Sequence, residues 1–138
     1  NNNFINVYWS KLSINSGALS ILKDETNVDK INWEVLSYNY GAGSMIRKNL
    51  DRMHWKGLSM NPAAINILEK NPEKIDWEWL SMNPAAIHII EKNPEKIDWE
   101  SLSANPAAGN LLRNNHTKIN VEGLLDNPNE KLRKELTN

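Results

Sequence analysis

One short unit repeats along this chain, and tryptophan marks its period. Four tryptophans stand 22 residues apart: Trp33, Trp55, Trp77 and Trp99. Each opens a near-copy of the segment from Trp77 to Ile87. A fixed period between about 20 and 50 residues is typical of chains that stack one small unit, because a single unit cannot bury its apolar face alone. The spacing therefore predicts a fold of stacked repeats.

The other landmarks keep the same register. Leucine follows the tryptophan position by three residues, and asparagine follows it by six. Two extra residues precede Trp33, and Val121 takes the tryptophan position in the last repeat. We predict a single repeat domain, residues 1–138, with repeats at about 7–30, 31–52, 53–74, 75–96 and 97–118 and a C-terminal cap at 119–138.

Each repeat carries the start signals of two helices. An acidic N-cap precedes the first helix at Asp76 and Asp98, and Ile75 with Leu80 is placed as a hydrophobic staple. Asparagine followed by proline favours a second helix start, because proline is pre-organised for the first helical position. The predicted asparagine caps are Asn61, Asn83 and Asn105. The predicted class is all-α: an α-solenoid of five to six 22-residue repeats, in which a short α or 3₁₀ helix alternates with a longer α-helix.

The core is predicted from the same spacing. Tryptophan and leucine lie three residues apart, so both point to one side of the first helix. Helices this short are marginal alone, and packing between repeats must stabilise them. The predicted structural core comprises Trp33, Trp55, Trp77 and Trp99 with Leu36, Leu58, Leu80 and Leu102.

Composition argues against several functional classes. A formal charge of -1 and a pI of about 6.3 give no electrostatic footprint for nucleic acid or an anionic membrane. No long apolar run or apolar signal segment is present, so we expect neither a membrane-spanning nor a secreted chain, but an intracellular one. The absence of cysteine excludes disulfides and thiolate chemistry. The sequence begins without methionine, which points to a longer parent protein.

The sequence offers no catalytic, cofactor-binding or metal-binding candidate. His54, His88 and His116 occupy three different positions in their repeats, so we do not expect them to converge on a metal ion. The serine that recurs four residues after the tryptophan has no recurring base beside it, and it is predicted to be a turn residue. We therefore predict a chain that is not an enzyme and takes no cofactor or small-molecule substrate.

Residues that vary between repeats are the candidates for partner binding. A row expected along one edge follows the recurring Leu-Ser pair: Ile14, Tyr38, Met60 and Met82. Large apolar side chains on an edge anchor protein partners; the alternative is that they pack beneath the neighbouring turn. Trp79 is unique to its repeat and is the leading hot-spot candidate, with cover of an adjacent apolar seam as its alternative role.

The two ends of the repeat array differ. At the C-terminus, polar residues replace small and apolar ones, which is typical of a terminal cap. At the N-terminus, Trp9 opens a nearly standard repeat with no polar cap before it. Three explanations stay open: the solenoid continues beyond this sequence, Phe4, Ile5 and Val7 fold over the end, or another chain stacks end to end on the Trp9 side.

The segments 68–77 and 77–87 resemble a known kind of viral repeat. They are similar to the short Trp-x-x-Leu-Ser-x-Asn-Pro-x-Ala-Ile repeats encoded by large, mimivirus-like DNA viruses of algae and amoebae. The resemblance covers most of the chain and is weaker where Ser16-Gly17 and Tyr40-Gly41 replace Pro-Ala. It implies a repeat type and an origin, and no catalytic residue. A looser likeness is to leucine-rich variant repeats, which alternate α and 3₁₀ helices without the tryptophan.

We therefore expect a non-enzymatic scaffold for protein–protein interaction or assembly. The specific form of this expectation is a structural component of a virus particle, located in the virion or the host cytoplasm if the chain is viral. Two alternatives are a solenoid that binds single-stranded nucleic acid and a non-catalytic repeat region of a larger enzyme. The nucleic-acid alternative is weakened because Lys23, Arg47 and Arg113 share one repeat position with Glu69 and Glu91.

Overall fold

The computed structural model describes residues 2–137. Within these residues the chain folds into α-helices, 3₁₀ helices (η) and turns, without a β-strand. The predicted all-α repeat fold, with short and longer helices in regular alternation, is confirmed. The chain divides into two compact units, Asn1–Lys74 and Ile75–Asn138, and their boundary coincides with a predicted boundary between repeats.

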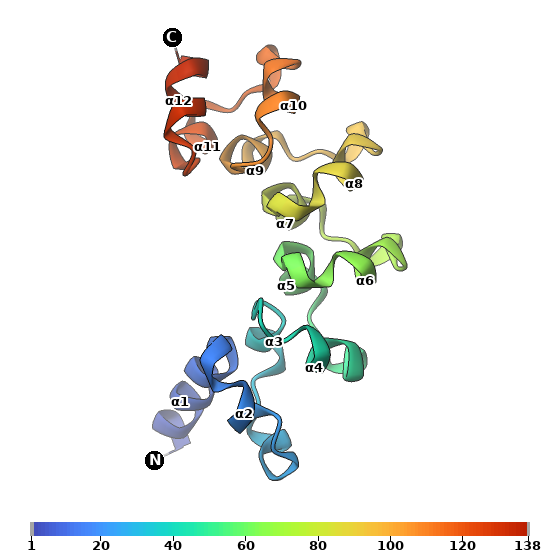
Figure 1. The fold of residues 1–138 in the computed structure, drawn as a ribbon, viewed down its shortest axis with the longest axis vertical. Helices are drawn as coiled ribbons and strands as arrows, with labels where there is room; N and C mark the ends of the chain where they lie inside the picture. The colour runs from blue at the N-terminus through green and yellow to red at the C-terminus, as the bar shows by residue number, and fades with distance from the viewer. Residues whose placement is uncertain (1, 138) are drawn as a thin grey trace. The chain divides into compact units, whose positions relative to one another are not determined.

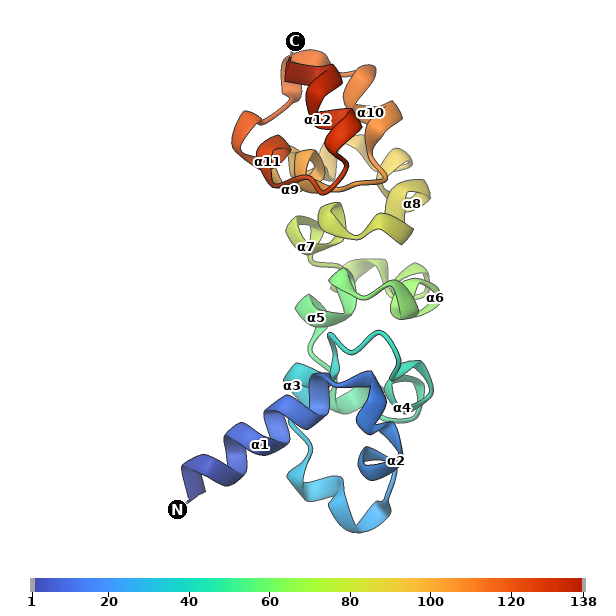
Figure 2. The ribbon, with the colours of Figure 1, turned by 60° about the vertical axis from the view of Figure 1, so that its left-hand side comes forward.

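The N-terminal unit contains three repeats. In both ribbon views its first helices, α1, α3 and α5, follow one another on one side, and its second helices, α2, α4 and α6, on the other (Figures 1 and 2). The bounds are α1 Asn2–Ile14, η1 Ser16–Ala18, α2 Leu19–Leu22, η2 Glu25–Lys30, α3 Trp33–Leu36, α4 Gly43–Lys48, η3 Leu50–Arg52, α5 Trp55–Met60, η4 Pro62–Ala64, α6 Ile65–Glu69 and η5 Pro72–Lys74.

The C-terminal unit repeats this arrangement. Its first helices pack in series, α9 on α7 and α11 on α9. The bounds are α7 Trp77–Met82, η6 Pro84–Ala86, α8 Ile87–Glu91, η7 Pro94–Lys96, α9 Trp99–Ala104, α10 Gly109–Arg113, η8 His116–Lys118, α11 Val121–Asp126 and α12 Glu130–Thr137.

The predicted cap residues bond to the first backbone amides of their helices. The carboxylates of Asp76 and Asp98 accept the N–H groups of Trp79 and Ser101 at 3.2 and 2.8 Å. The side-chain oxygens of Asn61, Asn83 and Asn105 accept the N–H groups of Ala63, Ala85 and Ala107 at 2.9 to 3.0 Å. Where proline follows the asparagine at η4 and η6, a 3₁₀ turn opens the second helix. The predicted single second helix is thus a 3₁₀ turn continued by a short α-helix.

The centre of the fold is a stack of small and medium aliphatic side chains. Each of the four repeats between residues 31 and 118 contributes a leucine, an alanine and one further aliphatic residue, all at 0% exposure: Leu36, Ala42 and Ile46; Leu58, Ala64 and Leu68; Leu80, Ala86 and Ile90; Leu102, Ala108 and Leu112. Burying each such leucine or isoleucine side chain contributes roughly 1.5–3 kcal/mol. The predicted leucines lie in this stack.

The structure places the four predicted core tryptophans differently. Trp33, Trp55, Trp77 and Trp99 are half-buried at the edge of the stack, because each is the first residue of its helix while the leucine one turn later points inward. A cation from the end of the last 3₁₀ helix in the same repeat lies over each ring. The pairs are Arg52 over Trp33 at 5.2 Å, Lys74 over Trp55 at 4.7 Å, Lys96 over Trp77 at 4.8 Å and Lys118 over Trp99 at 4.8 Å, and in the first repeat Lys30 over Trp9 at 5.4 Å. Such cation–π pairs shield the rings without burying them.

Buried serines join successive first helices. Ser37 donates its hydroxyl to the Trp33 carbonyl at 2.8 Å and accepts the backbone N–H of His54 from the next repeat at 2.9 Å. Ser13, Ser81 and Ser103 make the same pair of bonds to their own and the following repeat. The recurring serine is therefore a fully buried connector between repeats, not the turn residue that the sequence predicted.

Buried asparagines form a second set of links, the asparagine ladder: Asn39, Asn61, Asn105 and Asn127, each 0–1% exposed. The amide nitrogen of Asn61 donates to the Ser37 and Asn39 carbonyls of the preceding repeat at 2.8 and 3.2 Å. Asn105 and Asn127 donate to the corresponding pairs of carbonyls, and Asn39 donates to the Ser13 carbonyl. One side chain thus caps its own helix and binds the repeat before it.

The ladder ends at an arginine. Within residues 2–137, the guanidinium of Arg133 on α12 donates to the Asn127 carbonyl, whereas the corresponding carbonyls of Asn83 and Asn105 accept from the asparagine of the following repeat. Leu132 beside it is buried, and Glu135 on α12 accepts bidentate bonds from Arg113 at 2.6 and 2.9 Å. Helix α12 therefore takes the place of a following repeat.

Candidate binding surface

The buried ladders fix where the variable residues point. Tyr38 lies between Ser37 and Asn39, which are both buried, so its side chain must leave the core between them. Met60 at the end of α5 likewise lies between two buried residues, Ser59 and Asn61, whereas Ile14 at the end of α1 lies between the buried Ser13 and the exposed Asn15. Because the flanking residues recur in register, the side chains between them line up along one edge of the N-terminal unit.

Three predicted partner-binding residues come together in this way. Ile14, Tyr38 and Met60 line one hollow of about 440 Å³ together with Ser16 and Tyr40, named here the edge hollow. Ile14 is 46% and Tyr40 56% exposed, and Tyr38 and Met60 are half-buried. No lining residue is charged. The edge hollow therefore presents apolar and aromatic surface to solvent.

Hydrogen bonds hold one rim of the edge hollow. The Ser16 hydroxyl donates to the side-chain oxygen of Asn39 at 2.8 Å, and the same oxygen accepts the N–H of Gly41 at 3.0 Å. A Cβ on Gly41 would lie 2.9 Å from that of Ser16, so the two segments approach as closely as glycine allows. These contacts fix the backbone on either side of Tyr40.

In the C-terminal unit, smaller and polar residues replace the large apolar side chains of the row. Met82 is half-buried at the end of α7, and the positions that follow it in the row are Ala104 and Asp126. The leading hot-spot candidate, Trp79, is also half-buried on α7. Both remain candidates for partner binding, but no large apolar side chain continues the row beyond Met82.

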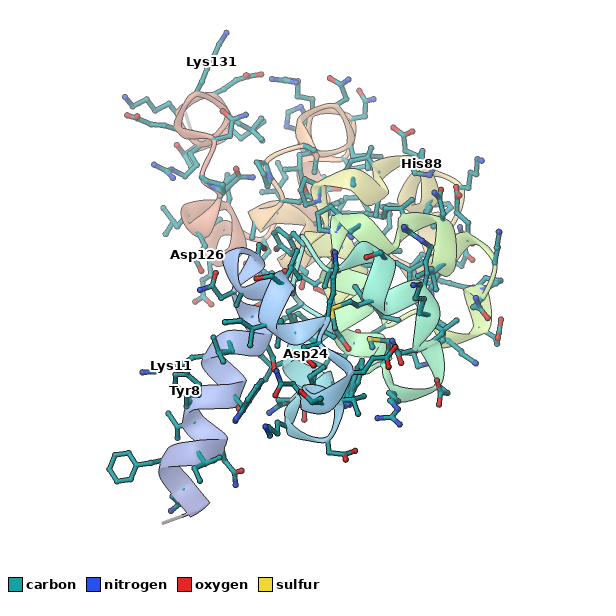
Figure 3. The ribbon with its side chains drawn as sticks, turned by 60° about the horizontal axis from the view of Figure 1, so that its bottom comes forward. Tyr8, Lys11, Asp24, His88, Asp126 and Lys131 are labelled. Carbon is teal, nitrogen blue, oxygen red and sulfur yellow. The ribbon has the colours of Figure 1, made fainter. Side chains whose placement is uncertain are left out.

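Trp9 lies in a different place from the row. It lines a second hollow of about 480 Å³ on α1 with Phe4, Ile5, Val7, Tyr8 and Lys11. Phe4, Ile5 and Val7 are exposed, so they do not fold over the end of the first repeat. The start of α1 projects past the rest of the N-terminal unit in Figure 2, and Tyr8 and Lys11 are marked on it in Figure 3.

The polar side chains form no reactive cluster within residues 2–137. His54, His88 and His116 are all exposed, and His88 lies on the outer side of α8 in Figure 3. No three potential metal ligands from histidine, aspartate and glutamate gather in this part of the chain. The pKa of Glu135 is lowered by its hydrogen bonds to Arg113, and the Thr26 hydroxyl lowers the pKa of Asp24. Both shifts come from local surface pairs.

Two features were not predicted from the sequence. The first is the place of Tyr40 in the edge hollow; Tyr40 replaces the proline of the standard repeat, and this departure from the repeat pattern could have indicated it. The second is that the serines and asparagines link neighbouring repeats. Their exact recurrence was the only indication, because a sequence shows that a polar residue recurs but not that it is buried.

Comparison of this chain with known proteins identifies no related protein. No family model, curated protein or solved structure matches this chain. Among the described residues, moreover, no helix has both the length and the apolar character needed to cross a bilayer. The similarity to repeats of large DNA viruses therefore stays a prediction.

Proposed function

We propose that this chain is a non-enzymatic scaffold that binds a protein segment in the edge hollow of its N-terminal unit. The observation that carries the proposal is the convergence of Ile14, Tyr38, Tyr40 and Met60 on one exposed, uncharged surface. Clusters of aromatic and aliphatic side chains on a rigid element are typical of interface hot spots.

The lining indicates the chemistry of the partner. Without charged groups, the hollow selects against a strongly charged ligand, because the ligand's charges would lose water without gaining a partner. The exposed Tyr40 adds a phenol that can hydrogen-bond a ligand at this largely apolar surface. We therefore assign the site to a peptide segment that carries large apolar side chains.

A matched pair of isoleucines tests this assignment. Ile14 lies in the hollow and is 46% exposed, whereas Ile21 lies outside it and is 44% exposed. Peptides selected from a random library against the whole chain should bind the wild type and Ile21→Asp alike. They should bind Ile14→Asp and Tyr40→Asp about tenfold or more weakly. Equal binding to Ile14→Asp and Ile21→Asp would remove the edge hollow from consideration.

Trp79 and Met82 are candidates for a separate binding surface on the C-terminal unit. Binding of the same peptides to Trp79→Ala and Met82→Ala, measured beside the two isoleucine variants, tests whether the C-terminal unit takes part. Unchanged affinity for both would confine the interaction to the N-terminal unit.

Nucleic-acid binding is the main competing proposal, and the cation–π pairs argue against it. Bases stack on aromatic faces that are open, but a lysine or arginine lies over each tryptophan that begins a repeat in the described range 9–118. An affinity for single-stranded nucleic acid that falls steeply with added salt would favour this alternative instead.

Assembly into a virus particle is the specific form of the scaffold proposal, and it implies a virion or host-cytoplasm location. Support for assembly comes from the exposed apolar residues near Trp9 in the first repeat. In the last repeat, by contrast, Arg133 already binds the carbonyl of Asn127. End-to-end stacking through the Trp9 side predicts concentration-dependent association in sedimentation that Ile5→Asp abolishes. Association that persists in Ile5→Asp would place the contact elsewhere. A repeat region within a larger enzyme is a remaining alternative; turnover by a protein that contains this chain, but not by the chain alone, would favour it.

A further inference from the structure

Successive first helices within each unit meet in one register. The residue two after the tryptophan position faces the preceding first helix. A Cβ on Gly57 would lie 2.7 Å from that of Ser37, and a Cβ on Gly123 would lie 3.2 Å from that of Ser103. Both serines are four residues after the tryptophan of the preceding repeat. The other neighbours of these two glycine positions are the residues one and five after that tryptophan, Glu100 and Tyr38.

The outer side of α11 is open in this register. Leu125 takes the place of the buried serine and is 62% exposed. Helix α12 takes the place of a following repeat only beside α10, where Glu135 binds Arg113. Glu122 and Asp126, one and five residues after the tryptophan position, are exposed too, and α11 carries no basic residue. A following first helix would therefore meet an apolar side chain between two carboxylates.

Helix α1 carries the complementary side chain. Lys11 is two residues after Trp9 and is exposed, and α1 contains no acidic residue. In the recurring register, α1 of a second copy places the aliphatic stem of Lys11 on Leu125 and its ammonium beside the two α11 carboxylates. Tyr8, one turn before Lys11 and 58% exposed, then meets Val121, one turn before Leu125 and 61% exposed.

Asn15 supplies an open hydrogen-bond donor at the end of α1. It holds the ladder position of the first repeat but is exposed, whereas the members of the asparagine ladder are buried. Its side-chain oxygen accepts the N–H of Gly17 at 2.8 Å, and its amide nitrogen has no acceptor within residues 2–137. In Asn61 the same nitrogen donates to the Ser37 carbonyl of the preceding repeat.

The Leu125 carbonyl is the matching acceptor. It holds the position of the Ser37 carbonyl in its own repeat. Pro128 has no N–H, and the Asn129 N–H goes to the Asn127 side chain, so neither residue that would close a turn donates to the Leu125 carbonyl. Arg133 occupies only the Asn127 carbonyl. One of the two ladder bonds is therefore available to a second copy.

The serine link is absent from both sides together. Leu125 has no hydroxyl to accept a backbone N–H. Tyr8 stands at the position whose N–H the serine serves in the other repeats, but it lies inside α1, where a helical bond satisfies that N–H. Leucine in place of serine therefore costs this junction no hydrogen bond.

We propose that this chain assembles head to tail, with α1 of one copy packed on α11 of another in the register of its own repeats. This names the partner surface for the end-to-end stacking proposed above and rests on that proposal, but not on peptide binding in the edge hollow. Each junction leaves one α1 and one α11 unpaired at the ends, so association continues beyond a dimer.

A charge exchange between two variants tests the junction. In sedimentation of the whole chain at low salt, Lys11→Glu alone and the double variant Glu122→Lys, Asp126→Lys alone should each associate at least about tenfold more weakly than the wild type, because like charges meet. An equimolar mixture should associate again, since each variant offers the charge that the other needs. Lys70→Glu, at an exposed lysine outside the junction, should behave as the wild type.

Three outcomes would overturn the head-to-tail junction. One is a mixture that stays monomeric while circular dichroism shows both variants folded. Another is undiminished association of either variant alone. The third is a wild-type chain that stays monomeric at millimolar concentration.

Asn15→Asp tests the hydrogen bond, because it keeps the oxygen that accepts from Gly17 and removes the amide donor. It should weaken association about three- to tenfold. Asn66→Asp makes the same charge change at an exposed asparagine and should leave association unchanged. Equal association of these two variants would contradict the junction.

Ile5→Asp separates this junction from stacking in general. Association that is lost in Ile5→Asp but not restored in the charge-exchange mixture would keep stacking through α1 and overturn only its contact with α11. Association that persists in Ile5→Asp and in both charge variants would overturn both proposals.

Discussion

The ladder asparagines show why a polar residue can occupy the most buried position of each repeat. The carboxamide of Asn61 is fully buried, yet its oxygen accepts one backbone N–H and its nitrogen donates to two backbone carbonyls. Every bond goes to the backbone, so the arrangement does not depend on which side chains vary nearby. A buried carboxamide is stabilising only when its groups are satisfied in this way.

Replacing a ladder asparagine should therefore lower the free energy of unfolding by more than the loss of a side chain of that size would. Asn61→Ala removes three hydrogen bonds, including one to the Ser37 carbonyl and one of the two to the Asn39 carbonyl, which we expect to lower the free energy of unfolding by roughly 2–4 kcal/mol. Asn66→Ala, at an exposed asparagine of the same unit, should change it by less than about 0.5 kcal/mol. Urea denaturation measures both values, and equal values would show that the ladder does not stabilise the fold.

The ion pair of Arg113 and Glu135 gives a pH-dependent prediction. The folded pKa of Glu135 lies below its ordinary value because Arg113 donates to the carboxylate. The resulting stabilisation is present above the ordinary glutamate pKa and is lost as the pH falls through the lower, folded pKa. Glu135→Gln should accordingly lower the urea midpoint at pH 7 and leave it unchanged in acid. Glu91→Gln is the matched control, and a loss for Glu135→Gln that is the same at all pH values would contradict the pairing.

At the scale of helices, the distance between neighbouring first helices depends on one variable position. The residue two after the tryptophan is Gly57 in α5 and Gly123 in α11, and it is Trp79 in α7. A Cβ on Gly123 would lie 2.2 Å from the carbonyl oxygen of Glu100 in α9, far inside van der Waals contact. The close packing of α11 on α9 thus requires glycine there.

Two glycine-to-alanine changes should have opposite effects. Alanine is the better helix former, so Gly43→Ala, whose Cβ meets its neighbours at 3.4 and 3.7 Å, should raise the free energy of unfolding by up to about 0.5–1 kcal/mol. Gly123→Ala must move α11 away from α9 and should lower it by roughly 1–3 kcal/mol despite the same gain in propensity. Thermal and urea denaturation of both variants provide the test. A stabilising Gly123→Ala would mean that α11 and α9 are further apart than described.

At the scale of the whole molecule, each of the two units is built from contacts between neighbouring repeats, and this limits how far a local change spreads. In the C-terminal unit the chain of asparagine bonds runs from Asn105 to Asn127 and ends at Arg133. Stability in such arrays is approximately a sum of repeat and nearest-neighbour terms. A change at the terminal helix should therefore loosen the last repeat first.

Arg133→Met tests this locality because it keeps the aliphatic stem and removes the donor to Asn127. We expect faster amide hydrogen exchange in α11 and α12 and unchanged exchange in the N-terminal unit. Lys131→Met, at a side chain that extends away from α12 in Figure 3, should leave exchange unchanged throughout. Uniformly faster exchange along the chain would indicate global cooperativity instead.

The sequence by itself determined the period, the two helices of each repeat, their cap residues and the leucines of the core. These follow from local chemistry, since caps, proline starts and apolar spacing act within one turn or one repeat. The row of Ile14, Tyr38 and Met60 was also recognisable, because variation within a strict repeat is visible in the sequence.

The tertiary structure decided what the local chemistry leaves open. The serine bonds within its own repeat and to the next one, and the asparagine bonds within its own repeat and to the preceding one; only the packed arrangement shows these partners in other repeats. The tryptophans lie at the edge beneath lysine and arginine because the cation comes from the far end of the same repeat. Likewise, the two extra residues before Trp33 are visible in the sequence. That they border a cavity depends on side chains from four separate elements, α2, η2, α3 and α4.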